Sequence, residues 1–154
     1  MGALRDGDAV SLRLKSDARY LCLVRAMIGS FGGLMGFGAD HVHRIILAVD
    51  EGCTNIIRHA HGGRPDGDIE VTCRAELLPS GRRQLVVVLV DDGSPAEDAR
   101  LCAGAASDPL TPGGLGLKLM RDIMDDVRFS RSEDGRNRLE LTLACPDTAA
   151  TPPG

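Results

Sequence analysis

The feature that most constrains the fold of this chain is an uninterrupted run of six apolar residues, LVVVLV, at 85–90. A strand of this kind offers no polar side to water, so it belongs where both faces of a sheet are covered. The run therefore predicts a central strand. Because 154 residues are the size of one domain, we expect one sheet around this strand and a single hydrophobic core.

Other segments show the pattern of strands with one side toward water. In 10–15 and 69–77, apolar residues alternate with polar ones, which is the period of a half-buried strand. Val127 and Phe129 begin another segment of this type, and 139–143 forms the last one. We therefore expect two strands that precede the central one in the sequence and two more near the end of the chain.

Apolar residues at helical spacing predict three helices between these strands. The first is capped at one of the residues 16–17 and ends in the glycine-rich segment GSFGGLMGFG at 29–38. The second is capped by Asp40 and reaches about His61. The third covers about 115–126 and follows a long stretch of small residues, glycine and proline.

The predicted order is β-α-α-β-β-loop-α-β-β. Hairpins joined by helices favour an α/β (α+β) two-layer sandwich, in which a mixed, mainly antiparallel sheet carries its helices on one face. We expect a flexible N-terminus at 1–9, one domain at 10–145 and a tail at 146–154 whose composition favours disorder.

The charge and the cysteines exclude several classes of protein. The net charge of −4 and the lack of a Lys or Arg run argue against direct nucleic-acid binding. The five cysteines include no CxxC pair, so we expect reduced thiols without a disulfide framework or structural zinc. No apolar run has membrane-spanning length and no signal pattern opens the sequence, so we expect a cytoplasmic protein.

The second predicted helix carries candidate ligand-binding residues on its polar side. Glu51 and Asn55 lie one turn apart, nearly opposite the apolar stripe, and His59 continues the same edge. An asparagine offers a neutral oxygen to Mg²⁺, and a glutamate can accept a proton from an attacking hydroxyl. The alternative is an ordinary solvent-facing edge of an amphipathic helix. The histidines at 41, 43 and 61 are expected to be solvated.

Two further segments have the composition of nucleotide-binding loops. Asp91 ends the central strand, where it could accept a hydrogen bond from an adenine amine, and Gly93 could let a flat base approach the backbone. The segment 113–118, GGLGLK, opens the third helix, and a glycine-rich helix start presents backbone N–H groups to phosphate. The alternatives are a plain turn for the first segment and a flexible connection for the second.

Taken together, these segments resemble the anti-sigma regulatory-factor serine/threonine kinases, within the Bergerat-type histidine-kinase-like ATPases. The resemblance rests on LAVDEGCTNIIRHAH, VDDGSP, GGLGLKLMRDIMDDVRF and DGRNRLELTL, and it covers roughly 10–145. It implies that Glu51 is the catalytic base, that Asn55 holds Mg²⁺ and that 94–112 form a short lid over ATP. The residues that would bind ATP are Asn55, His59, Asp91, Gly93, Gly113, Gly114, Leu115, Gly116, Leu117 and Lys118.

The same resemblance implies a function and partners. The chain would use ATP and Mg²⁺ to phosphorylate a serine or threonine of an anti-sigma antagonist protein. It would sequester a sigma factor without contacting nucleic acid or membrane, and the resemblance also suggests a homodimer. Three alternatives remain open: a non-catalytic ATP-dependent binding module in a partner-switching pathway, a separate histidine-kinase catalytic domain, and an interaction domain that needs no nucleotide. A phospho-accepting histidine on a dimerisation helix, which the second alternative requires, is not apparent before residue 40.

Overall fold

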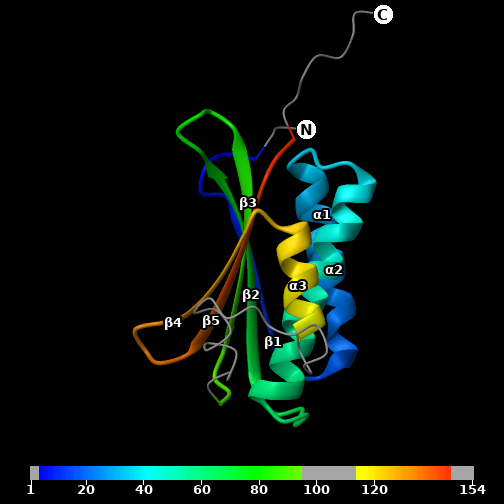
Figure 1. Ribbon diagram of the computed structural model, residues 1–154, viewed down its shortest axis with the longest axis vertical. Helices are drawn as coiled ribbons and strands as arrows, with labels where there is room; N and C mark the ends of the chain where they lie inside the picture. The colour runs from blue at the N-terminus through cyan, green and yellow to red at the C-terminus, as the bar shows by residue number, and fades with distance from the viewer. Residues whose placement is uncertain (1–3, 95–113, 147–154) are drawn as a thin grey trace, which may run out of the picture.

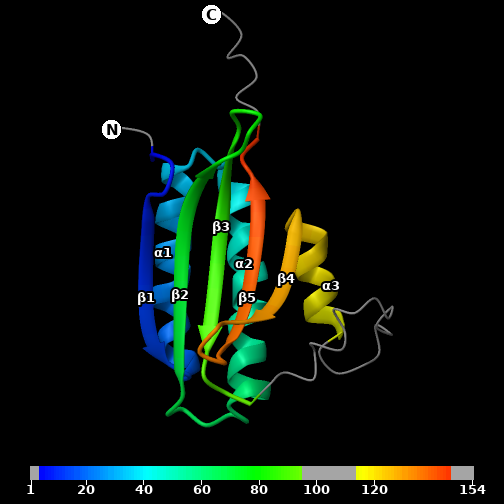
Figure 2. The same cartoon turned by 90° about the vertical axis from the view of Figure 1, so that its left-hand side faces the viewer.

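The computed structural model describes residues 4–94 and 114–146, which form two layers (Figure 1). One layer is a sheet with the strand order β1-β2-β3-β5-β4, and the other consists of helices that cover one face of it (Figure 2). The strands are β1 (Ala9–Lys15), β2 (Asp68–Leu77), β3 (Arg83–Asp91), β4 (Asp126–Arg131) and β5 (Asn137–Ala144). The helices are α1 (Leu21–Leu34), α2 (Ala39–Asn55) and α3 (Gly114–Ile123). The predicted two-layer sandwich is confirmed.

The sheet differs from the expected mixed type in one respect. All strand pairings within the described residues are antiparallel: β1 with β2, β2 with β3, β3 with β5, and β5 with β4. The hairpins β2–β3 and β4–β5 account for two of these pairings, because a hairpin can only join antiparallel strands. The helical segment α3 then brings the second hairpin beside β3.

The strand β3 lies at the centre of the sheet and is buried on both faces, as its sequence predicts. Leu85, Val87 and Leu89 point into the core under the helices. On the other face Val86 is 1% exposed and Val88 is 4% exposed, although none of the described helices covers them. Arg74 and Glu76 form an ion pair on β2, and Arg138 and Glu140 form another on β5. The aliphatic parts of such long side chains on neighbouring strands cover apolar surface while the charges stay in water.

The first helix ends inside the glycine-rich segment, as predicted, but only after its first six residues. Asp17 caps a short 3₁₀ turn, and α1 then continues through most of that segment to Leu34. Packing overrides the low helix propensity of glycine here. A Cβ on Gly32 would lie 3.2 Å from Cγ2 of Val42 on α2, so the missing side chain lets the two helices approach closely.

The start of α2 differs from the expected one, whereas its helical structure extends about as far as predicted. Gly38 precedes the helix as its N-cap, and Asp40 lies in the first turn instead of capping it. After Asn55 the chain continues as a π-helical turn, Ile56–Ala60, so helical structure does reach the residue before His61. The third helix ends at Ile123, earlier than predicted, because β4 begins at Asp126 and the residues between them turn toward the sheet.

Residues before β1 also contact the sheet. Gly7 donates its N–H to the carbonyl oxygen of Ala75 at 2.8 Å, and Asp6 accepts the N–H of Leu77 at 2.8 Å. The domain boundary at residue 10 stays a prediction. Most of the expected lid (94–112) and of the tail, together with Gly113, lies outside the described residues.

In the part of the chain that the structure describes, no helix combines the length and the apolar character needed to cross a membrane.

Candidate functional site

The start of α3 lies against the polar edge of α2. A Cβ built on Gly116 would lie 2.7 Å from Oε2 of Glu51 and 3.6 Å from Nδ2 of Asn55. Glu51 and Asn55 are half-buried, and Gly116 is buried. Any larger residue at 116 would displace the Glu51 carboxylate. Two of the predicted segments, far apart in the sequence, therefore meet at one place.

This contact puts a carboxylate and a carboxamide beside the N-terminus of a helix. The first N–H groups of a helix have no partner within the helix, and together with the helix dipole they favour an anion. The segment beginning at Gly114 is thus suited to a phosphate group, with the side chains of Glu51 and Asn55 next to it. Among the described residues, no group of three or more His, Cys, Asp or Glu side chains could hold a metal ion. A cation at this place would therefore need phosphate oxygens among its ligands.

The other predicted residues of this segment do not all point to the same place. Leu117 is 3% exposed and belongs to the hydrophobic core, whereas Leu115 is 68% exposed. Lys118 donates to the carboxylate of Asp122 at 2.6 Å, one turn further along α3. His59 is exposed in the π-helical turn that follows α2.

Asp91 is buried at the end of β3 and its carboxylate is oriented by two donors. Oδ1 accepts the backbone N–H of Gly93 and the side-chain amide of Asn137, both at 2.9 Å. The same amide of Asn137 also donates to the carbonyl oxygens of Gly93 at 3.2 Å and Ser94 at 3.1 Å. Sequence reasoning missed Asn137, because only the β3–β5 register places it opposite Asp91.

Gly93 is needed for packing against the end of the α2 helical segment. A Cβ on Gly93 would lie 2.5 Å from the carbonyl oxygen of Ala60, and Ser94 donates its N–H to the same oxygen at 2.8 Å. The side on which we expected a flat base to approach is therefore occupied by protein backbone. The glycine instead allows the loop after β3 to join the turn after α2.

His61 is buried, contrary to the expectation that it is solvated. It is 4% exposed, and its ring lies beside the end of β3. His41 and His43 are exposed, as expected. Next to His61 is an open, polar cavity of about 430 Å³, lined by His61, Arg64, Asp66, Gly67, Asp92, Gly93 and Ser94.

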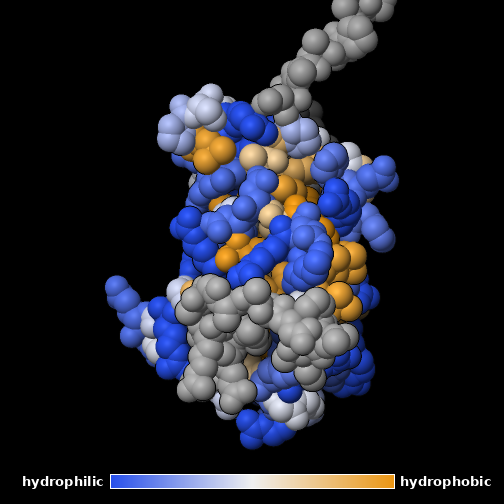
Figure 3. Space-filling model, in the orientation of Figure 1, coloured by the Kyte–Doolittle hydropathy of each residue, from blue (hydrophilic) through white to orange (hydrophobic). Residues whose placement is uncertain are grey.

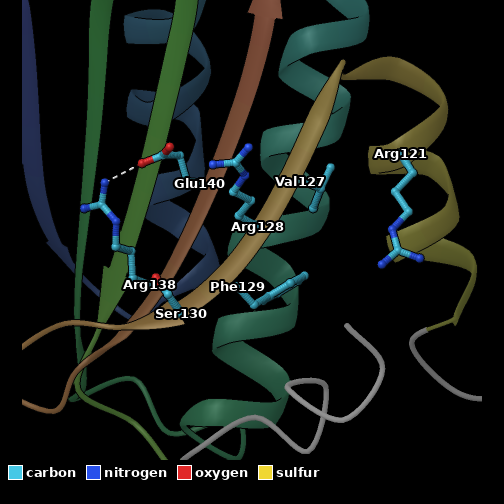
Figure 4. A pocket seen from close by; sticks show the side chains of 7 residues that line it. All are labelled: Arg121, Val127, Arg128, Phe129, Ser130, Arg138 and Glu140. Atoms are coloured by element: carbon cyan, nitrogen blue, oxygen red, sulfur yellow. Dashed lines mark hydrogen bonds and ion pairs between the residues drawn. The ribbon is translucent and has the colours of Figure 1, made fainter. Parts of the chain in front are cut away.

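A second cavity lies between α3 and β4 and contains none of the predicted site residues. Its volume is about 320 Å³, and Figure 4 shows Phe129 on β4 and Arg121 on α3 pointing into the space between the two elements. On this side of the molecule, apolar surface follows the seam between the sheet and the helices (Figure 3). Neither Asp91 nor Glu51 lines this cavity, so it is a weaker candidate for the nucleotide site.

Known protein kinases are similar to this chain in sequence. Serine-protein kinase RsbW of Bacillus licheniformis is 29% identical over 129 residues, which are 80% of this chain and 79% of that protein. RsbW of Bacillus subtilis is 28% identical over 130 residues, covering 80% of this chain and 78% of the relative.

Two solved structures share the fold. The RsbU and RsbW domains of a Mycobacterium tuberculosis protein match 90% of this chain with a TM-score of 0.59 and 16% identity, and this chain spans 33% of that longer one. The SiaB–SiaC complex of Pseudomonas aeruginosa gives a TM-score of 0.54 at 12% identity, over 88% of this chain and 89% of that one. The sequence pattern described as the histidine kinase-like ATPase domain matches residues 14–143, and the chain therefore belongs to that family.

Proposed function

We propose that this chain is an ATP-dependent serine/threonine protein kinase that phosphorylates an anti-sigma antagonist and sequesters a sigma factor in the cytoplasm. The observation that carries the proposal is the contact between the start of α3 and the pair Glu51 and Asn55 on α2. The relatives named serine-protein kinase support the same activity.

The residues at this contact fit a magnesium-bound triphosphate. The N–H groups that begin α3, from Gly114 to Gly116, would bind phosphate oxygens, with Gly113 expected to contribute to the same site. The side-chain oxygen of Asn55 would bind Mg²⁺, which prefers hard oxygen ligands and accepts phosphate oxygens and waters as its other ligands. When bound, Mg²⁺ would neutralise charge that develops on the phosphates during transfer.

The adenine base would be recognised by Asp91. Because Gly93 and Asn137 already hold Oδ1, the carboxylate is oriented before any ligand arrives, and Oδ2 is the oxygen left to accept an N–H from the adenine amine. Preorganised groups of this kind lose little conformational freedom on binding. His59, exposed in the π-helical turn after α2, is proposed to contact the nucleotide from the helix side.

Glu51 is proposed to act as the general base. Its carboxylate would accept the proton of a serine or threonine hydroxyl on the partner as that oxygen forms a bond to the γ-phosphorus. The bond between this phosphorus and the β–γ bridging oxygen breaks, and ADP leaves. Gly116 supports this role because it leaves room for the carboxylate beside the phosphate-binding helix start.

Two substitutions separate nucleotide binding from phosphoryl transfer. Asn55→Ala should remove most of the magnesium-dependent part of ATP affinity, whereas Glu51→Ala should retain ATP binding and abolish transfer. Calorimetry with ATP and Mg²⁺ measures the first, and transfer of labelled phosphate to a candidate antagonist protein measures the second. Unchanged magnesium-dependent affinity in Asn55→Ala would contradict the metal assignment. A stable complex with the antagonist without any label transfer would favour the non-catalytic binding module.

We also propose that the chain pairs with a second copy through a flank formed by β1 and α1. Leu23 and Leu34 are 50% and 42% exposed, and Tyr20 just before α1 is 41% exposed, on the side of the helix that faces away from α2. Val10, on the edge strand β1 in front of α1 in Figure 2, is 50% exposed. Several large apolar side chains on one flank favour protein contact.

Leu23→Asp should shift the sedimentation of the purified protein from dimer to monomer, and an unchanged profile would contradict this interface.

A further inference from the structure

His61 is a buried histidine whose Nε2 atom faces two carboxylates without a hydrogen bond. Its side chain is 3% exposed, and Nε2 lies 3.7 Å from Oδ1 of Asp92 and 4.0 Å from Oδ1 of Asp91. Nε2 has no hydrogen-bond partner within the described parts of the chain. Buried polar atoms in folded proteins are nearly always paired, so an unpaired one beside a proposed ligand-binding carboxylate calls for an explanation.

The ring is held in this position by close backbone packing. A Cβ on Gly67 would lie 2.1 Å from Nδ1 of His61, so the imidazole lies directly against the glycine backbone. Gly67 is itself held by Ser16, whose N–H donates to the Gly67 carbonyl at 2.8 Å and whose hydroxyl accepts the Gly67 N–H at 3.1 Å. The imidazole therefore has little room to turn away from the end of β3.

In the part of the chain that the structure describes, charged groups lie near the ring at three places: the end of β3, the loop before β2 and the start of β2. They are Asp91, Asp92, Arg64, Asp66 and Asp68. Arg64 donates to the backbone carbonyl of His61 at 3.3 Å and not to the ring. The carboxylate of Asp68 is paired with Lys15 at 2.8 Å. Among the described residues, the two carboxylates within 4.0 Å of Nε2 are those of Asp91 and Asp92.

We propose that His61 is a positioning residue of the nucleotide site: its neutral ring leaves Asp91 available to adenine, and its protonation weakens nucleotide binding. This inference rests on the proposed function, through the assignment of Asp91 to the base. A proton on Nε2 places a cation beside the Asp91 carboxylate, which lowers the strength of that carboxylate as an acceptor. By linkage, a base amine bound to Asp91 must oppose protonation of His61 to the same extent. The histidine side chain ordinarily changes charge within the physiological pH range.

The test is the pH dependence of ADP affinity, measured by calorimetry with Mg²⁺ from about pH 8 to about pH 5.5, where histidine gains its proton. His61→Gln keeps a polar side chain of similar length that does not titrate. His43→Gln is the matched control, because His43 is exposed on α2. The protonation of free ADP is the same in the experiments with all three proteins, so it cancels in the comparison.

The wild type and His43→Gln should lose about fivefold more affinity over this pH range than His61→Gln, at the lower end of typical coupling between two sites. Parallel profiles for the wild type and His61→Gln would overturn the inference while leaving the proposed function intact. Absence of ADP binding at about pH 8 in the wild type would overturn the proposed function and this inference with it.

A second measurement applies if His61→Gln does not fold. The titration of the His61 ring in the wild-type protein, followed by NMR, should move to lower pH when ADP is added. An unmoved midpoint would overturn the inference.

Discussion

At the scale of single residues, two glycines and one asparagine define the geometry of the proposed site. Gly116 places the start of α3 against Glu51, Gly93 joins the loop after β3 to Ala60, and Asn137 orients Asp91. At each glycine a neighbouring oxygen comes within a distance that any side chain would prevent, whereas Asn137 acts through its hydrogen bond. These contacts determine where the carboxylates of Glu51 and Asp91 point.

Gly116→Ala should therefore impair catalysis more than stability. The new Cβ would lie 2.7 Å from Oε2 of Glu51, which is the end of a flexible side chain and can move aside. We expect phosphoryl transfer to fall by about tenfold or more, because displacement of a reacting group by about 1 Å is costly. The free energy of unfolding should change by less than about 1 kcal/mol, since alanine favours the helix.

Gly29→Ala is the matched control for this substitution. Its Cβ would make an ordinary contact, 3.8 Å from Cδ1 of Ile46. Transfer rates from a labelled-ATP assay and urea unfolding curves give both quantities. An equal loss of activity in the two variants would show that the Gly116 contact has no special role.

At the scale of elements, the packing of α1 on α2 depends on a glycine that sequence analysis placed at a helix end. Gly32 faces Val42, with its Cβ position 3.2 Å from Cγ2, whereas the Cβ position of the neighbouring Gly33 has nothing within 4 Å. Gly32→Leu should lower the free energy of unfolding by about 1–3 kcal/mol because it overpacks the helix interface. Gly33→Leu should cost nothing or stabilise slightly, through helix propensity. Urea unfolding compares them, and equal effects would contradict this account of the interface.

At the scale of the whole molecule, buried thiols make the stability of the fold depend on pH in the alkaline range. Burial raises the pKa of Cys53 to about 12, with a further contribution from the Asp50 carboxylate, and burial alone raises the pKa of Cys73 to about 12. Between the ordinary thiol pKa of 9.0 and about 12, the folded chain keeps protons that the unfolded chain loses. Stability must therefore fall as pH rises through this range.

The midpoint of urea unfolding under reducing conditions should be lower at about pH 10.5 than at about pH 8. Cys73→Ala should lower stability at both pH values, because it leaves a cavity, but the difference between them should shrink. Cys22→Ala is the control, since Cys22 is exposed. A pH dependence that is identical in the wild type and Cys73→Ala would contradict the assignment to buried thiols.

The acid side of the stability curve depends on exposed and half-buried carboxylates. A hydrogen bond from Gln84, and then the neighbouring Arg74, lower the pKa of Glu76, and hydrogen bonds from Lys15 lower that of Asp68. Their contribution is present above the ordinary pKa of a carboxylate and is lost as pH falls through the lowered value. Because these groups are mostly solvated, the contribution is small.

The sequence by itself determined the elements and the faces they bury, because burial on one side imposes a period that is visible in neighbouring residues. The central position of β3 and the polar edge that carries Glu51 and Asn55 follow from such local patterns. The burial of His61 and the pairing of Asn137 with Asp91 were decided only by the tertiary structure, since each depends on segments distant in the sequence. The same holds for Gly32 and Gly116. A glycine shows in sequence that a side chain is absent, but what fills the space is known only once another element packs there.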